Sequence, residues 1–248
     1  MSMSHRDNIK FSIITVMYNA EKYAEKTILS VINQSYKNIQ YIVVDGNSID
    51  HTKDVLSKYK DNIDVLISEK DNGIYDAMNK GISVADGDYL IFMNAGDRFA
   101  SSSVLEIINN SISIPTYVYY GNTLQVFADK IERRNEKTNC FRITRFNICH
   151  QSLFYPSSLL KKSPYNLRYN VLADWALNIK LMGITRFKYV EADICEYDME
   201  GVSSTDDKYK DPNFINDLPM LIWHNLGLIS YLFFLSKECF KKCLIWRL

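Results

Sequence analysis

Three polar clusters in the first hundred residues could bind a ligand, because each comes directly after a short apolar run. They occupy residues 17–19, 45–48 and 94–97. In the second cluster, the Asp45 carboxylate could accept an imide N–H while Ser48 satisfies its other lone pairs; an Asx turn is the alternative. In the third, Asp97 lies among small residues, which suits a divalent cation also bound by phosphate oxygens, and a plain turn is an equal alternative. We expect Asp50 to cap the helix that follows it.

Three further places in the chain hold side chains that could take part in a reaction. Lys80 could reach a phosphate from a predicted helix, although lone lysines on helices are usually solvated. Asp174 lies in the first turn of another predicted helix, where the helix dipole favours a carboxylate. Its apolar neighbours, including Trp175, also make it a candidate general base with a shifted pKa. The pair His150 and Gln151 precedes a predicted strand, and a purely structural role is its alternative.

A parallel sheet is the scaffold that the first half of the chain predicts. Continuous apolar runs predict buried strands at 11–16, 41–44, 64–67 and 89–93. Helical patterns lie between them at 20–34, 52–59 and 74–84. Alternating strands and helices indicate parallel strands with right-handed crossovers, and such sheets bind ligands at the carboxyl ends of their strands. The three polar clusters should therefore meet at one edge.

The pattern is less regular after residue 101. Apolar runs on either side of Gly121 and Asn122 predict a hairpin, and the charged stretch 129–139 predicts a mobile surface loop. The remaining predictions are a strand at 152–155, a helix at 172–182 ending at Gly183, and a flexible stretch at 203–211.

Composition excludes several classes of function. The chain has 29 basic and 29 acidic residues, so it lacks the positive field that holds nucleic acid, and 47% hydrophobic residues provide a core. The glycine motifs of dinucleotide-binding proteins and P-loop NTPases are absent, as is the serine elbow of α/β-hydrolases. Five scattered cysteines without a C-x-x-C pair and a polar N-terminus lead us to expect a reducing, cytoplasmic location.

The last thirty residues are apolar and end in a basic cluster. Residues 218–235 approach the roughly 20 residues of a membrane-spanning helix, but Pro219, His224, Asn225 and Ser230 interrupt them. Four basic residues and one acidic residue then leave a net charge of +3. This combination favours a helix lying on a membrane surface, and a helix packed on the core or on a dimer partner is the alternative.

Taken in order, these motifs resemble the inverting family 2 glycosyltransferases of the GT-A fold, particularly bacterial enzymes that build surface polysaccharides such as O-antigen. The resemblance covers about residues 11–203. Its carriers are residues 14–19, 43–50, 69–81, 92–97, 150–151 and 173–175. It implies an α/β fold with a Rossmann-like mixed sheet flanked by helices, followed by apolar or amphipathic C-terminal helices. The division it suggests is a tail at 1–10, a nucleotide-sugar half at 11–100, an acceptor and catalytic-base half at 101–212, and membrane-associating or packing helices at 213–248.

The resemblance also implies roles by position. The residues that would hold the nucleotide sugar are Thr15, Tyr18, Asp45, Gly46, Ser48, Asp71, Lys80, Asn94 and Ala95. Asp45 would accept the N3–H of uracil, Asp97 would contact Mn²⁺ or Mg²⁺, and Asp174 would be the catalytic base. The acceptor side would include His150, Gln151 and Trp175. Asn94 and Gly96 depart from the family's Asp-x-Asp metal motif, and Ala173 replaces an acid often found beside the base.

The implied reaction moves a hexose or N-acetylhexosamine from a UDP-sugar to a saccharide on undecaprenyl diphosphate, with inversion, in O-antigen, lipopolysaccharide or capsule assembly. We expect a peripheral protein on the inner face of the bacterial cytoplasmic membrane, which could form a homodimer, and no nucleic-acid partner. Two alternatives are a non-catalytic nucleotide-sugar-binding protein and a sugar-phosphate nucleotidyltransferase. The latter usually has a glycine-rich basic loop after its first strand, where this chain has residues 17–20 without a glycine.

Overall fold

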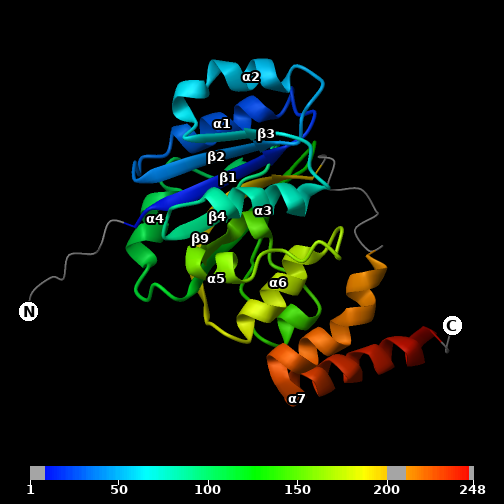
Figure 1. Ribbon diagram of the computed structural model, residues 1–248. Coiled ribbons are helices and arrows are strands. Elements are labelled where there is room, and N and C mark those ends of the chain that lie inside the picture. Colours follow the sequence, from blue (N-terminus) through cyan, green and yellow to red (C-terminus); the bar gives the residue numbers. More distant parts are fainter. Residues whose placement is uncertain (1–8, 200–210, 246–248) are drawn as a thin grey trace, which may run out of the picture.

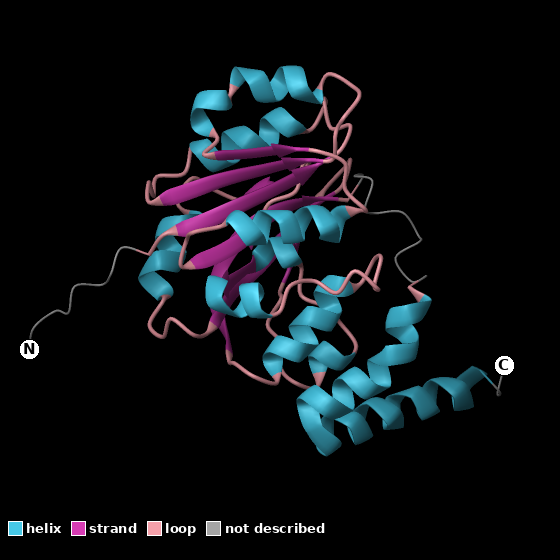
Figure 2. Ribbon diagram, viewed as in Figure 1, coloured by secondary structure: helices cyan, strands magenta, loops and turns pink. Residues whose placement is uncertain are grey.

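The computed structural model describes residues 9–199 and 211–245, and it shows a mixed sheet covered by helices on both faces (Figures 1 and 2). Nine strands of this described part form one sheet in the order β3-β2-β1-β4-β8-β6-β9-β5, with β7 paired to β6. The strands are β1 (Phe11–Met17), β2 (Ile39–Asp45), β3 (Val65–Ser68), β4 (Tyr89–Phe92), β5 (Arg98–Phe99), β6 (Val118–Val126), β7 (Ile131–Arg134), β8 (Leu153–Pro156) and β9 (Phe187–Asp198). The helices are α1 (Ala24–Ile32), α2 (Thr52–Lys58), α3 (Ile74–Val84), α4 (Val104–Ser111), α5 (Ser157–Lys162), α6 (Ala173–Met182) and α7 (Pro212–Ile245), with 3-10 turns η1 (Lys60–Asn62), η2 (Arg142–Thr144) and η3 (His150–Ser152).

The predicted parallel half is confirmed. Strands β3, β2, β1 and β4 are parallel, and the predicted helices between them are present as α1, α2 and α3. All seven residues of β1 are buried, and its side chains alternate between two hydrophobic clusters, one on each face of the sheet. Burial on both faces explains why the strand reads as a continuous apolar run.

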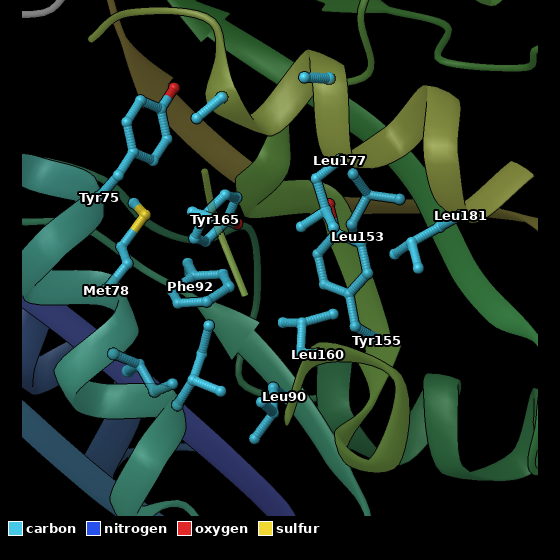
Figure 3. Packing of buried hydrophobic residues seen from close by; sticks show 14 of the residues in the cluster. Tyr75, Met78, Leu90, Phe92, Leu153, Tyr155, Leu160, Tyr165, Leu177 and Leu181 are labelled. Atoms are coloured by element: carbon cyan, nitrogen blue, oxygen red, sulfur yellow. The ribbon is translucent and has the colours of Figure 1, made fainter. Parts of the chain in front are cut away.

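One of these clusters contains side chains from both halves of the chain (Figure 3). Met78 of α3 and Phe92 of β4 contribute from the first half, while Tyr155 of β8 and Leu177 of α6 contribute from the second. Tyr165 packs against Phe92 with tilted rings whose centroids are 5.5 Å apart. The two proposed halves therefore share a core.

Two predictions for the second half are wrong. Gly121 and Asn122 do not form a hairpin turn, because β6 runs through them and pairs with β9. A Cβ on Gly121 would lie 2.5 Å from the Ala192 carbonyl oxygen, so glycine here permits a close strand contact at a register irregularity. The chain turns after residue 126 instead, and residues 131–134 of the predicted mobile loop form β7.

The C-terminal helix α7 consists of two segments that meet at Gly227, whose φ of 78° and ψ of 178° are not helical. Pro219, predicted as an interruption, lies inside the first segment, and the break falls where glycine can adopt a positive φ. Phe214 of the first segment packs on Trp175 of α6 with ring centroids 5.2 Å apart. The second segment contacts the body through Phe233, which packs against Phe141, and leads toward the C-terminus (Figure 1).

Some predictions fall outside the described residues. These are the N-terminal tail up to residue 8, most of the polar stretch 203–211, and the last three residues. The basic cluster, apart from Lys237, also lies among side chains that the structure does not describe.

Candidate active site

Two adjacent loops form the edge of the sheet where β1 and β2 end, and hydrogen bonds connect them. Ser48 Oγ accepts from the Asn19 backbone N–H (2.8 Å), and Asn19 Oδ1 accepts from the Ile49 N–H (3.0 Å). Asp50 accepts from the Thr52 N–H (3.0 Å) at the start of α2, as predicted for a cap. These hydrogen bonds hold the two loops together at the surface where a ligand would lie.

Two of the predicted base contacts are buried beneath that surface. The Asp45 carboxylate accepts from the Ser48 N–H (3.1 Å), the Ser48 hydroxyl and the Ser68 hydroxyl (2.7 Å). Thr15 Oγ1 accepts from the Tyr41 hydroxyl (3.1 Å) within the core. Both side chains are fully buried, so a ligand N–H could reach Asp45 only if one of the serines rotated away.

Tyr18, Gly46 and Asp71 lie together at the surface of the same edge. The Tyr18 side chain is 62% exposed. A Cβ on Gly46 would lie 3.3 Å from Tyr18 Cδ2 and 2.5 Å from Asp71 Oδ2, so any larger residue would collide with the carboxylate. An exposed ring beside a carboxylate can stack on a nucleobase while accepting a hydrogen bond from the nucleoside.

Lys80 lies next to this surface but is engaged. Its Nζ is 2.8 Å from Glu69 Oε1 and donates to the Lys70 carbonyl at 2.8 Å. Asp71, the next residue, accepts from the Gly73 N–H (3.0 Å). These two contacts leave one of the three ammonium N–H donors of Lys80 for a phosphate.

Asp97 belongs to a second, buried cluster. Its Oδ2 accepts from Gln151 Nε2 (2.5 Å) and its Oδ1 accepts from the Asp198 N–H (3.1 Å). Burial raises the pKa of the Asp97 carboxyl to about 6, although these hydrogen bonds and the charge of His150 act to lower it. The neighbouring Ala95 N–H donates to the Val16 carbonyl (3.2 Å), which holds the segment against the end of β1.

His150 connects this cluster to the candidate base. Its Nε2 is 2.9 Å from Asn94 Nδ2, and its Nδ1 is 3.5 Å from Asp174 Oδ2. Burial lowers the pKa of His150, but the hydrogen bond and charge of Asp174, together with the charges of Cys149 and Asp97, raise the pKa overall. Asn94 Oδ1 is buried and has no hydrogen-bond partner among the described residues.

Asp174 is buried and held from several sides. Its Oδ1 accepts from the Tyr75 hydroxyl (3.1 Å) and the Trp175 N–H (2.8 Å), and its Oδ2 accepts from Asn147 Nδ2 (2.7 Å). Trp175 Nε1 donates to the Ile143 carbonyl (2.6 Å), so the indole N–H is already bonded within the protein. A carboxylate fixed in this way is oriented to accept a proton from a neighbouring hydroxyl.

The structure thus brings together the predicted residues from positions 94–97, 150–151 and 174–175. Sequence reasoning missed two members of this cluster. Tyr75 lies in the segment 69–81 that carries the family resemblance, but its bond to Asp174 joins residues 99 positions apart. Asn147 lies outside every motif, and we find no signal in the sequence that singles it out.

Comparison with known proteins decides the family. The sequence model of glycosyl transferase family 2 matches residues 12–178 of the chain. The chain belongs to this family. Among its relatives is a PGL/p-HBAD biosynthesis glycosyltransferase of Mycobacterium bovis, which is 31% identical over 257 residues, covering 96% of this chain and 94% of the relative.

Solved structures show the same fold. The glycosyltransferase resembles S. aureus TarS 1–349 in complex with UDP-GlcNAc, with a TM-score of 0.68 and 18% identity over 88% of this chain and 66% of that one. It spans 39% of a longer TarS chain. It also resembles the mannosyltransferase PcManGT of Pyrobaculum calidifontis in complex with GDP-Man and Mn²⁺, with a TM-score of 0.58 and 15% identity over 75% of this chain and 56% of that one. The GT-A-like fold predicted from the sequence is confirmed, and the protein is a glycosyltransferase.

Proposed function

We propose that this glycosyltransferase moves a hexose or N-acetylhexosamine from a UDP-sugar to a saccharide on a polyprenyl diphosphate, with inversion, during assembly of a bacterial O-antigen or capsule. The observation that carries the proposal is the buried chain of contacts from Asn94 through His150 to Asp174. These contacts support Asp174 as the base, because they connect it to Asn94 in the segment that would face the donor diphosphate. The UDP-GlcNAc complex of TarS supports a UDP-sugar as donor.

In the proposed reaction, Asp174 accepts the proton of the acceptor hydroxyl while that oxygen bonds to the anomeric carbon. The bond from that carbon to the UDP oxygen breaks, and its electron pair leaves with the diphosphate. One in-line displacement inverts the configuration. Tyr75 and Asn147 donate to opposite oxygens of Asp174, so they hold the carboxylate in one orientation during the transfer.

A divalent cation fits the residues at 94–97. Asn94 Oδ1 lacks a partner among the described residues, and the Asp97 carboxylate is close by in the chain, so both would offer the oxygen ligands that Mg²⁺ and Mn²⁺ prefer. No group of three or more His, Cys, Asp or Glu side chains that could hold a metal comes together in the described part of the chain. The other ligands would therefore be diphosphate oxygens and water. Such a cation supplies positive charge for the departing diphosphate.

Helix α7 is the proposed membrane contact. Its stretch Pro212–Lys237 is, in the described part of the chain, the one helix long and apolar enough to cross a membrane. We propose surface binding on the inner face of the cytoplasmic membrane, because the first segment packs on α6 and Gly227 breaks the helix. In the second segment Ile229 is 73% exposed and Leu232 is 54% exposed, so they suit the boundary between headgroups and acyl chains.

The test of the membrane step uses the full chain. An Ile229→Gln/Leu232→Gln variant should no longer float with anionic liposomes, while Leu66→Gln, an exposed apolar residue of the edge strand β3 on the side of the molecule opposite α7 (Figure 1), should float like the wild type. Size-exclusion chromatography of both variants tests the alternative. A dimer lost in the double variant, with flotation retained, would make this face a homodimer interface.

A donor screen tests the proposed reaction. UDP-Glc, UDP-Gal, UDP-GlcNAc and UDP-GalNAc are each offered with GlcNAc- or GalNAc-diphosphate lipid, with Mn²⁺ or with EDTA. Transfer from one of these donors, abolished by EDTA, is the expected result. Donor binding without transfer or donor hydrolysis under every condition would favour the binding-protein alternative.

A further inference from the structure

Two arginines in the segment before Asn147 lie over one exposed aromatic ring. The guanidinium carbons of Arg142 and Arg145 are 5.9 and 6.0 Å from the centroid of the Phe146 ring, which is 56% exposed. The ring face attracts each cation, but the two cations repel each other. An anion bound near both would relieve that repulsion.

Three basic residues of the preceding segment have acidic partners, whereas these two have none among the described residues. The ion pairs of this region are Lys130 with Glu132, Arg133 with Asp193, and Arg134 with Glu136. Arg142 donates to the Asn135 carbonyl (3.3 Å), and its charge lowers the pKa of the buried Glu136, whose ion pair is nevertheless made with Arg134. Within the described residues, neither Arg142 nor Arg145 forms an ion pair. Their charges are therefore available to a ligand.

Short stretches of backbone link the two arginines to the candidate base. Asn147, two residues after Arg145, donates to Asp174, and the Ile143 carbonyl, next to Arg142, accepts from Trp175. Two residues of extended chain span at most about 7 Å. An acceptor whose reacting hydroxyl lies at Asp174 could thus place an anionic group on the same sugar, or on the next one, over the arginine pair.

Apolar surface continues from this segment to α7. Phe141 packs edge to face against Phe233 with ring centroids 5.1 Å apart, and the second segment of α7 exposes Ile229 and Leu232. A lipid chain attached to the anionic group would therefore meet apolar side chains. The segment 141–146 combines the two properties that a phosphate-linked lipid requires.

We propose that Arg142 and Arg145 bind the phosphate groups of the lipid-linked acceptor, with Phe146 holding both guanidinium groups in place. The planar guanidinium fork matches phosphate oxygens better than an ammonium does. This inference rests on the proposed function and names the part of the acceptor that the segment recognises. In this proposal Arg142 and Arg145 bind the diphosphate of the acceptor and do not contact its reacting hydroxyl.

The first experiment compares two acceptors in detergent micelles, which remove any effect of a bilayer. One is a GlcNAc-diphosphate lipid, and the other carries the same sugar on a neutral alkyl chain of equal length. In an Arg142→Gln/Arg145→Gln variant, KM for the diphosphate lipid should rise at least tenfold, while KM for the neutral acceptor and for the donor stays unchanged. Arg133→Gln, which removes a nearby cation that already has Asp193 as partner, should behave like the wild type. An equal change for both acceptors, or no change for either, overturns the proposal.

The second experiment does not depend on turnover. Farnesyl diphosphate is titrated into the wild type and both variants by calorimetry, with saturating UDP so that the donor site is filled, and farnesol serves as the phosphate-free control. Binding of farnesyl diphosphate that is lost only in the double variant supports the proposal, even if neither acceptor is used and the proposed reaction is wrong. Wild-type protein that binds farnesyl diphosphate no better than farnesol, or a double variant that binds it as tightly as the wild type, overturns it. Circular dichroism confirms that the variants are folded.

Discussion

The edge of the sheet that we propose to bind the donor, called here the donor edge, differs from the cluster around Asp174 in the hydrogen bonds and the exposure of its polar side chains. At the exposed surface of the donor edge, Asp71 bonds to Gly73, two residues away, although the buried Asp45 beneath it bonds both to Ser48 and to the more distant Ser68. Around the base, Asp97 bonds to Asp198 and Asp174 to Tyr75, both distant in the chain, and Asp174 also accepts from the adjacent Trp175 N–H. Tyr18 at the donor edge is 62% exposed, whereas Asp174 is 7% exposed.

This difference has an energetic consequence. A buried network leaves its remaining members unpaired when one is removed, and each unpaired group costs about 1–3 kcal/mol. An exposed surface loses only the contact that was removed. Substitutions in the base cluster should therefore lower kcat strongly, and substitutions at the donor edge should raise KM for the donor moderately.

The largest effect should come from Asp174→Asn. Without a carboxylate to accept the proton, kcat should fall about a thousandfold, while the affinity for UDP stays within about twofold of the wild type. Initial rates and calorimetric titration of UDP measure the two quantities. Asp217→Asn on α7 is the control for loss of a carboxylate away from the cluster. Near wild-type turnover of Asp174→Asn would remove it as the base.

The pH dependence of stability tests the burial of Asp97. Burial raises the pKa of this carboxyl from about 3.8 when unfolded to about 6. Its contribution to stability is therefore fully present below about pH 4 and is lost as the pH rises through about 6. Between pH 4 and pH 7, the free energy of unfolding of Asp97→Asn should rise relative to the wild type by about 2–3 kcal/mol.

Denaturant titrations in EDTA measure this difference, because bound metal would favour the charged carboxylate. Asp86→Asn, which removes a carboxylate that is 57% exposed, should show little change over the same range. A difference between Asp97→Asn and the wild type that stays constant with pH would show that Asp97 is solvated like Asp86. The contrast between the two regions would then fail.

Substitutions of His150 separate its two contacts. His150→Gln keeps a polar atom near the position of Nε2, toward Asn94, but loses the contact of Nδ1 with Asp174. Loss of one hydrogen bond to a charged group costs about 1.5 kcal/mol, so kcat should fall about tenfold with KM for the donor unchanged. His150→Asn keeps a donor near the position of Nδ1 and should lose less. If the two variants have the same kcat, the contact with Asp174 does not orient the base.

The smallest effect should come from Tyr18→Ala. Stacking of a base on an aromatic ring contributes about 1 kcal/mol, so KM for the donor should rise about fivefold at constant kcat. Tyr18→Phe keeps the ring and should retain the wild-type KM. Steady-state kinetics over donor concentration measure both. A fall in kcat with an unchanged KM for the donor would contradict this prediction, because it is the effect expected of the base cluster.

The same difference explains how much could be predicted from the sequence. Buried parallel strands are continuous apolar runs, and a cap such as Asp50 bonds two residues away, so both follow from local pattern. The bond between Asn147 and Asp174 spans 27 positions and follows from no local rule. The bond between Asp45 and Ser48 was predicted, but the bonds of Asp45 to Ser68 and of Thr15 to Tyr41 join residues 23 and 26 positions apart and also follow from no local rule.

Two glycines account for two further differences between the sequence-based prediction and the structure. Gly121 follows an aromatic run and resembles a turn, but it is needed for the close contact between β6 and β9. Gly227 was not singled out, because polar residues and Pro219 around it were the more evident interruptions. In both cases the backbone conformation depends on what the rest of the fold places nearby.

The bend at Gly227 has a geometric consequence for the proposed enzyme. The first segment of α7 is attached through Phe214 to Trp175, the residue after Asp174, while the second begins at the bend and is attached through Phe233 to Phe141. If the second segment rests on a bilayer, the base is held at a set height above it. The enzyme would then select among acceptor hydroxyls by their distance from the membrane plane as well as by their chemistry.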